Sequence, residues 1–280
     1  MSAYRDYTAL RVRTERGVAF VTIDHPPINL FDLTLIGEMG RVGEELAADD
    51  AIRAVVIDSA NPDFFIAHAD VTLIQQLPTD ASRRPTEPHF FQAMVERFRT
   101  MPKATIAKIE GIARGGGSEF VLSCDMRFGA LGRAVLAQPE VALGIIPGGS
   151  GTQRLPRLLG RGRALEVILG CDDVSAETAE RWGYLNRALP PAELGPFVER
   201  LAFRIASFPG EAIALAKACV DADSMPIREG LLEEGWAFTK TVGTAAAKER
   251  MASFMAAGGQ TAAVERDLGR LLEILARNHP

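Results

Sequence analysis

The chain of 280 residues is long enough to bury one large hydrophobic core, with room for a smaller helical region beside it. Its formal net charge of −5 and the lack of a long Lys/Arg run make nucleic acid a poor partner, because a phosphate backbone would be repelled. No apolar run approaches the roughly 20 residues of a membrane span, so we expect a cytoplasmic protein outside the membrane.

The chain opens with strand-like and helix-like patterns. The stretches Thr8 to Arg13 and Val18 to Asp24 are rich in β-formers and flank a turn, which predicts a hairpin. Apolar residues from Leu35 to Leu46 then recur at helical spacing, and Asp32 before them is a candidate N-cap. This pattern predicts an amphipathic helix.

Short apolar runs at 54–57 and 64–67 are typical of buried strands. A polar stretch with Pro78, Pro85 and Pro88 follows, and it either borders a ligand pocket or is an ordinary surface loop. The pattern from Phe90 to Met101 predicts a helix.

In the middle of the chain we expect strands at 105–109, at 126–131 and around 135–136, with a helix at 119–123. From Thr152 onward almost everything is helical in pattern, with breaks near Gly170, Pro190, Pro209 and Pro226. These units predict an α/β core over residues 1–205 and a helical C-terminal region over 206–280.

The three cysteines are far apart, odd in number and without CxxC spacing. That pattern disfavours both a disulfide framework and a zinc site, so we expect reduced thiols and no metal. They are Cys124, Cys171 and Cys219.

A glycine triplet, Gly115 to Gly117, lies where a strand gives way to a helix. Free amides at a helix start, without side chains to block them, can bind an oxyanion or a phosphate. Phosphate is the weaker alternative because no P-loop Lys-Ser/Thr pair follows, and tight helix-to-strand packing would also explain the glycines.

Two glutamates accompany glycine-rich turns. Glu119 lies about one helical turn beyond Gly116, and Glu140 precedes a second glycine-rich turn at 144–151. Glu119 could instead be a solvated first-turn residue that complements the helix dipole. A pair of carboxylates near free amides suits the addition of water to an activated alkene, with one acid as base and the other as proton donor.

These motifs together resemble the crotonase, or enoyl-CoA hydratase/isomerase, family. The resemblance runs from about Phe20 to Leu189, through Pro-Pro-Ile-Asn at 26–29, Phe-Ile-Ala-His-Ala-Asp at 65–70, Gly-Gly-Gly-Ser-Glu at 115–119, Gln-Pro-Glu at 138–140 and Pro-Gly-Gly-Ser-Gly-Thr-Gln-Arg-Leu at 147–155. It implies a spiral of ββα units, a C-terminal region for trimerisation, and a homotrimer or homohexamer.

The resemblance also implies residue roles. The amides of Ala67 and Gly116 would hold the thioester oxygen, Glu119 would activate water, Glu140 would protonate the α-carbon, and the Gly148 amide would place the water. An acyl-CoA groove would be lined by Asn29, Ala67, His68, Ala69, Asp70, Leu73 and Gly115. Coenzyme A is then part of the substrate, and we expect no separate cofactor.

The sequence departs from the family pattern at His68 and Ser150, where the family usually has glycine, and in its long C-terminal stretch. Both glutamates favour an enoyl-CoA hydratase. The alternatives are an isomerase of the same family, a thioester hydrolase using Ser118 or Ser150, and a non-catalytic CoA-binding protein.

Overall fold

The computed structural model describes residues 4–77, 86–222, 227–242 and 244–257. The strands are β1 (Leu10–Glu15), β2 (Val18–Ile23), β3 (Ala54–Ser59), β4 (Phe64–Ile66), β5 (Ala104–Ile109), β6 (Ile112–Arg114), β7 (Met126–Ala130), β8 (Val135–Ala137), β9 (Val174–Ser175) and β10 (Arg187–Leu189). The helices are α1 (Leu33–Ala48), α2 (Val71–Gln75), α3 (Phe90–Thr100), α4 (Gly116–Ser123), the 3₁₀ helix η1 (Glu140–Leu143), α5 (Gly151–Leu159), α6 (Arg161–Gly170), α7 (Ala176–Trp182), α8 (Pro191–Ala206), α9 (Gly210–Asp221), α10 (Ile227–Val242) and α11 (Ala245–Ala256).

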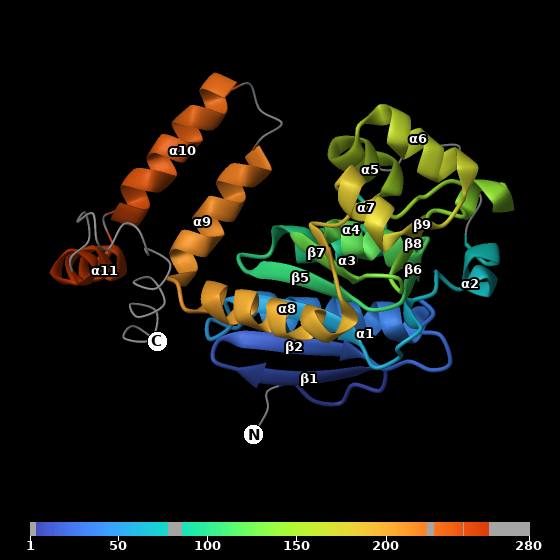
Figure 1. The fold of residues 1–280 in the computed structure, drawn as a ribbon, viewed down its shortest axis with the longest axis horizontal. Helices are drawn as coiled ribbons and strands as arrows, with labels where there is room; N and C mark the ends of the chain where they lie inside the picture. The colour runs from blue at the N-terminus through green and yellow to red at the C-terminus, as the bar shows by residue number, and fades with distance from the viewer. Residues whose placement is uncertain (1–3, 78–85, 223–226, 243, 258–280) are drawn as a thin grey trace.

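Two sheets form the core (Figure 1). The six-stranded sheet has the order β1-β2-β3-β5-β7-β10, and the four-stranded sheet has the order β4-β6-β8-β9. Strands β1 and β2 form the predicted hairpin, with Leu10 opposite Ile23, and the other neighbours in the large sheet are parallel. A parallel strand that is covered on both faces carries apolar residues at successive positions. Residues 54–57 therefore show no alternation of apolar and polar residues.

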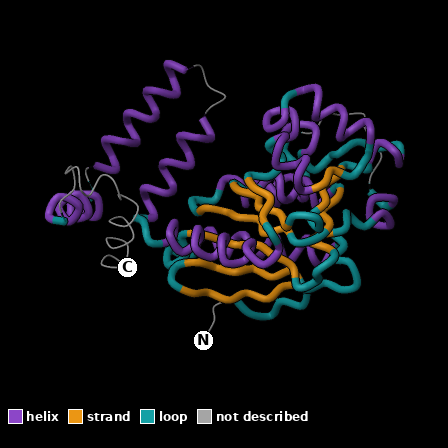
Figure 2. The backbone as a smooth tube through the Cα atoms, viewed as in Figure 1, coloured by secondary structure: helices purple, strands orange, loops and turns teal. Residues whose placement is uncertain are grey.

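Helices cover both faces of the large sheet (Figure 2). Helix α8 contacts β2, β3, β5 and β7 on one face, where alternate residues such as Phe20, Val56 and Ile106 are buried. The residues between them, such as Val21 and Ile57, face the main core with the apolar sides of α1, α3 and α4. The period of two along each strand thus divides the apolar residues between two cores.

The predicted helix near Leu35 is confirmed as α1, and Asp32 is its N-cap. The Asp32 carboxylate accepts a hydrogen bond from the Leu35 N–H at 2.9 Å, which satisfies one of the free amides of the first turn. The predicted strands at 54–57, 64–67, 105–109 and 126–131 are likewise present.

The structure differs from the sequence prediction in its shortest strands. Strand β6 lies between the predicted strand at 105–109 and the glycine triplet, where the sequence predicted no strand, and β9 and β10 lie in the third that we read as helical. Elements of two or three residues are too short to display a period of two, so only their pairing in the folded chain defines them. Residues 78–85 of the predicted polar loop lie outside the described residues, and so does Pro226, a predicted helix break.

Helices α9, α10 and α11 project from the core in Figure 1, beyond the end of α8 at Ala206. Helix α9 is tied to the core by the Lys217 ammonium, which lies 2.8 Å from the Asp125 carboxylate. Within the part of the chain that the structure describes, no helix has the length and apolar character of a membrane span.

Candidate active site

The glycine triplet places helix α4 against strand β4 and against η1. A Cβ on Gly117 would lie 2.4 Å from the Ile66 carbonyl oxygen, so only glycine allows this close approach. Gly115 has φ = 51°, a region that favours glycine, and its Cβ would lie 2.8 Å from Glu140 Oε1. Gly117 thus serves close packing of the helix on the strand, whereas Gly115 lies beside Glu140 at the candidate site. Both interpretations of the triplet therefore apply, at different glycines.

Glu119 is anchored by the second glycine-rich turn rather than by solvent. Its Oε1 accepts hydrogen bonds from the amides of Gly149, Ser150 and Gly151 at 2.7, 2.9 and 2.8 Å. These amides belong to the start of α5, where the N–H groups have no intrahelical acceptors and the dipole favours an anion. With 4% of its surface exposed, Glu119 is not the solvated first-turn residue of the alternative reading.

Two opposing effects set the protonation of Glu119. Burial raises its pKa, whereas the three amide hydrogen bonds and the charge of Arg154 lower it. Burial outweighs these contacts, so the pKa of Glu119 is raised overall, and the three amides and Arg154 limit that rise.

Glu140 is the second buried carboxyl group, with 9% of its surface exposed, at the first position of η1. Burial raises its pKa from 4.5 to about 7, and the negative charge of Glu119 acts in the same direction. A substantial fraction of Glu140 is therefore protonated at neutral pH, whereas the amides around Glu119 act in favour of its anion.

A buried polar network lies behind Glu140. With its NH₂ group facing Glu140, the Gln138 amide donates to Oε2 at 3.0 Å, and its oxygen accepts from Ser118 Oγ at 3.2 Å. Ser118 Oγ is also 2.5 Å from the Tyr184 hydroxyl, and with the Ser118 proton given to Gln138 the Tyr184 hydroxyl donates in that pair. In this orientation the Gln138 amide joins Glu140 to Ser118 and Tyr184.

The predicted oxyanion role of the Ala67 amide does not fit the structure. The Ala67 N–H donates to the Ile28 carbonyl at 3.2 Å, so this amide is already engaged. The Ala69 nitrogen faces Gly116 instead: a Cβ built on Gly116 would lie 3.5 Å from it. Gly116 is the first residue of α4, so its N–H has no intrahelical acceptor. The amides of Ala69 and Gly116 therefore lie close to each other at the start of α4.

Asn29 was predicted to line the CoA groove, and its surroundings argue against this. It is 1% exposed, and its Nδ2 donates to Ser59 Oγ and to the carbonyls of Phe64 and Phe65. Its oxygen accepts from the His25 amide at 2.8 Å. Asn29 therefore joins two loops behind the site, and its φ of 53° is one that asparagine tolerates.

The other predicted groove residues lie around the start of α2. His68 Nδ1 lies 2.8 Å from the Ala69 carbonyl, and Asp70 caps α2 by accepting from the Thr72 amide at 2.8 Å. Leu73 packs partly buried against the core. Gly148 is exposed, and its carbonyl accepts from Gln92 Nε2 at 2.8 Å, which leaves its amide next to the turn that holds Glu119.

Comparison with known proteins places this geometry in a family. Residues 13–259 match the family described as enoyl-CoA hydratase/isomerase. The chain belongs to the enoyl-CoA hydratase/isomerase family.

Members of the enoyl-CoA hydratase/isomerase family resemble the chain over most of its length. It is 33% identical to the short-chain-enoyl-CoA hydratase of Clostridium acetobutylicum, covering 86% of this chain and 92% of the relative. It is also 33% identical to the crotonyl-CoA hydratase of Syntrophomonas wolfei, covering 89% and 95%. The solved enoyl-CoA hydratase of Bacillus anthracis superposes with a TM-score of 0.82 at 29% identity, covering 89% and 96%.

Sequence reasoning missed several groups of this enoyl-CoA hydratase/isomerase site. The sequence does not show that the amides of residues 149–151 bind Glu119, nor that Tyr184, 65 residues along the chain from Glu119, lies beside Ser118. Only the glycine-rich composition of 148–151, followed by a helix, signalled that free amides needed a partner.

Proposed function

We propose that this protein adds water across the 2,3 double bond of 2-enoyl-CoA thioesters and forms 3-hydroxyacyl-CoA. The observation that carries the proposal is the pair of buried glutamates with opposite environments. Glu119 is held by three amides that act in favour of its anion, and Glu140 has a pKa raised to about 7, so that part of it stays in the acid form at neutral pH. The relatives named as hydratases support the same reaction.

In this mechanism the amides of Ala69 and Gly116 bind the thioester oxygen and stabilise the enolate charge. Glu119 accepts a proton from water, whose oxygen bonds to C3 as the π electrons move toward the thioester. Glu140 gives its proton to C2, and proton exchange with solvent restores both glutamates. Coenzyme A leaves with the product, so the reaction needs no separate cofactor.

Other chemistries fit the site less well. Ser118 is fully buried against Tyr184, and Ser150 Oγ accepts from Arg154, so neither serine is paired with a histidine among the described contacts. Isomerisation needs one acid-base residue to move a proton between carbons, whereas this site holds two buried glutamates in different surroundings.

A screen of short, medium and aromatic 2-enoyl-CoAs tests the proposal by the loss of the conjugated thioester absorbance. We expect Glu119→Gln and Glu140→Gln each to lower kcat by about 10²- to 10⁴-fold while CoA thioesters still protect the protein against thermal unfolding. Normal turnover in either variant would sink the mechanism. Release of free thiol would indicate a hydrolase, and conversion of 3-enoyl-CoA without hydration would indicate an isomerase. Thermal protection with no conversion would indicate a non-catalytic CoA-binding protein.

We further propose that residues 1–205 form the catalytic core and that residues 206–280 assemble it into a homotrimer or a homohexamer in the cytoplasm. Exposed apolar side chains on α10 support this, with Leu232 65%, Trp236 59% and Phe238 69% exposed in the single chain.

A further inference from the structure

The turn that holds Glu119 contains a strained residue. Ser150 has φ = 143°, a region that residues with a Cβ rarely adopt, and its N–H is the central one of the three that bind Glu119 Oε1. Such a conformation persists only when its surroundings hold it in place. The contacts of the Ser150 side chain therefore bear on the position of Glu119.

Arg154, one helical turn further along α5, contacts Ser150 directly. Its Nε donates to Ser150 Oγ at 3.1 Å, and its Nη2 donates to Glu96 Oε2 of α3 at 2.6 Å. The Arg154 side chain is 17% exposed, so its planar fork is confined between these two partners.

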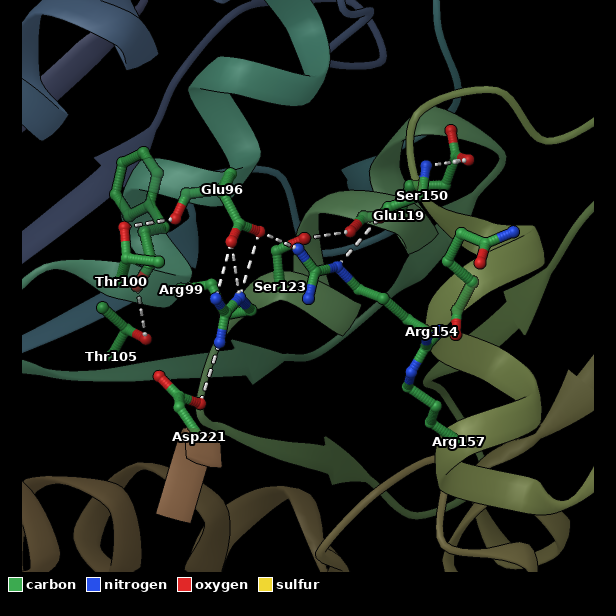
Figure 3. Close-up of polar contacts among 12 residues, drawn as sticks. Glu96, Arg99, Thr100, Thr105, Glu119, Ser123, Ser150, Arg154, Arg157 and Asp221 are labelled. Carbon is green, nitrogen blue, oxygen red and sulfur yellow. Dashed lines mark hydrogen bonds and ion pairs between the residues drawn. The ribbon is translucent and has the colours of Figure 1, made fainter. Parts of the chain in front are cut away.

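The ion pairs continue from Glu96 to the C-terminal helices (Figure 3). Arg99 donates to Glu96 Oε1 from Nε at 2.9 Å and from Nη2 at 2.6 Å, and its Nη1 lies 2.8 Å from Asp221 Oδ1 at the end of α9. A continuous series of polar contacts thus runs from α9 through α3 to the turn that binds Glu119.

We propose that Arg154 is a positioning residue for the base Glu119. It braces the strained Ser150 turn through its guanidinium and is itself anchored by Glu96, Arg99 and Asp221. This deepens the proposed function, since it rests on Glu119 acting as the base. Through Asp221 the brace also links the helices beyond the core to the catalytic turn.

The charge of Arg154 also gives this role a measurable effect, on the pKa of Glu119. The positive charge of Arg154 on α5 lowers the pKa of Glu119, while the negative charge of Glu119 raises the pKa of Glu140 on η1 and of Tyr184 after α7. Glu96 offsets the charge of Arg154 at close range. Removing Arg154 should therefore raise the pKa of Glu119, and removing the charge of Glu96 should lower it.

The experiment measures the pH profile of 2-enoyl-CoA hydration for wild type, Arg154→Gln, Glu96→Gln and Arg154→Lys. Arg157→Gln is the matched control, because Arg157 lies one turn further along α5 and is exposed. Glu119 must be ionised to accept a proton. We therefore expect the acidic limb of the Arg154→Gln profile to move to higher pH and that of Glu96→Gln to move to lower pH.

For Arg154→Gln we expect kcat to fall by about 10- to 100-fold with KM little changed, because a misplaced catalytic group loses rate more than binding. Arg154→Lys keeps the charge but not the fork, so its acidic limb should return toward wild type while kcat stays low. An Arg154→Gln enzyme with an unshifted limb and kcat within about two-fold of wild type would overturn the inference. Lack of turnover by wild type would instead refute the proposed function, so the two failures are distinguishable.

Discussion

At the scale of single residues, the site is defined by the different surroundings of two buried glutamates, Glu119 and Glu140. Both side chains are removed from water, which by itself raises the pKa of a carboxyl group. Three amide hydrogen bonds partly compensate for the burial of Glu119, whereas Glu140 faces the Gln138 amide and the negative charge of Glu119. Two such groups divide acid and base work between them at one pH.

The raised pKa of Glu140 predicts how the reaction depends on pH. Glu140 acts as a proton donor, so only its protonated form is active, and that form is lost as the pH rises through about 7. We expect kcat/KM to fall about tenfold per pH unit on the alkaline side. A profile measured with a saturable 2-enoyl-CoA checks this, and constant kcat/KM up to pH 9 would contradict the role of Glu140.

The oxyanion role of the Gly116 amide can be tested at the same scale. Gly116 is the first residue of α4, a position at which proline is accepted, so Gly116→Pro removes the N–H without ending the helix. We expect kcat to fall about 10²- to 10³-fold. Gly116→Ala is the control, because it brings the same crowding, 3.3 Å from the Ala69 Cβ, and keeps the donor. Equal kcat in the two variants would exclude this amide from catalysis.

At the scale of elements, Gly117 determines how closely α4 approaches β4. Alanine there would place its Cβ 2.4 Å from the Ile66 carbonyl oxygen, so the helix or the strand must move. We expect Gly117→Ala to lower stability by about 1–3 kcal/mol in thermal or urea unfolding. At Gly37 in α1 a Cβ meets nothing within 4 Å, and Gly37→Ala should raise stability by up to about 1 kcal/mol. Equal effects would contradict the packing argument.

The longer elements were predictable from sequence because their periodicity and caps are local. Helix α1 shows this best, since its apolar spacing and the Asp32 cap are both within 16 residues of chain. Strands β9 and β10 were not predictable, because only pairing with distant strands makes them strands.

The site could be predicted only in part, and the reason is the direction of backbone groups. Both glutamates follow from motifs, and the structure buries both. The sequence of a loop does not indicate which N–H points toward the ligand, so Ala67 was chosen although its amide binds Ile28. A motif residue such as Asn29 can likewise recur for its internal hydrogen bonds rather than for substrate contact.

At the scale of the whole molecule, helices α9 to α11 expose much of their surface in the part of the chain that the structure describes. Helix α9 has no buried residue, and α10 exposes Trp236 and Phe238. We expect Trp236→Arg combined with Phe238→Glu to shift the protein from an oligomer to a smaller species in light scattering after gel filtration. Glu199→Arg, at an exposed position of α8, is the control. An unchanged mass would place the assembly surface elsewhere.

The anchoring of Glu119 by main-chain amides has a consequence for how this enzyme can vary over evolutionary time. The three donors belong to the backbone of Gly149, Ser150 and Gly151, and a substitution cannot delete a backbone donor unless it introduces proline. Side-chain substitutions in this turn, such as glycine in place of Ser150, can change how firmly the base is held. The backbone donors themselves remain as long as the fold does.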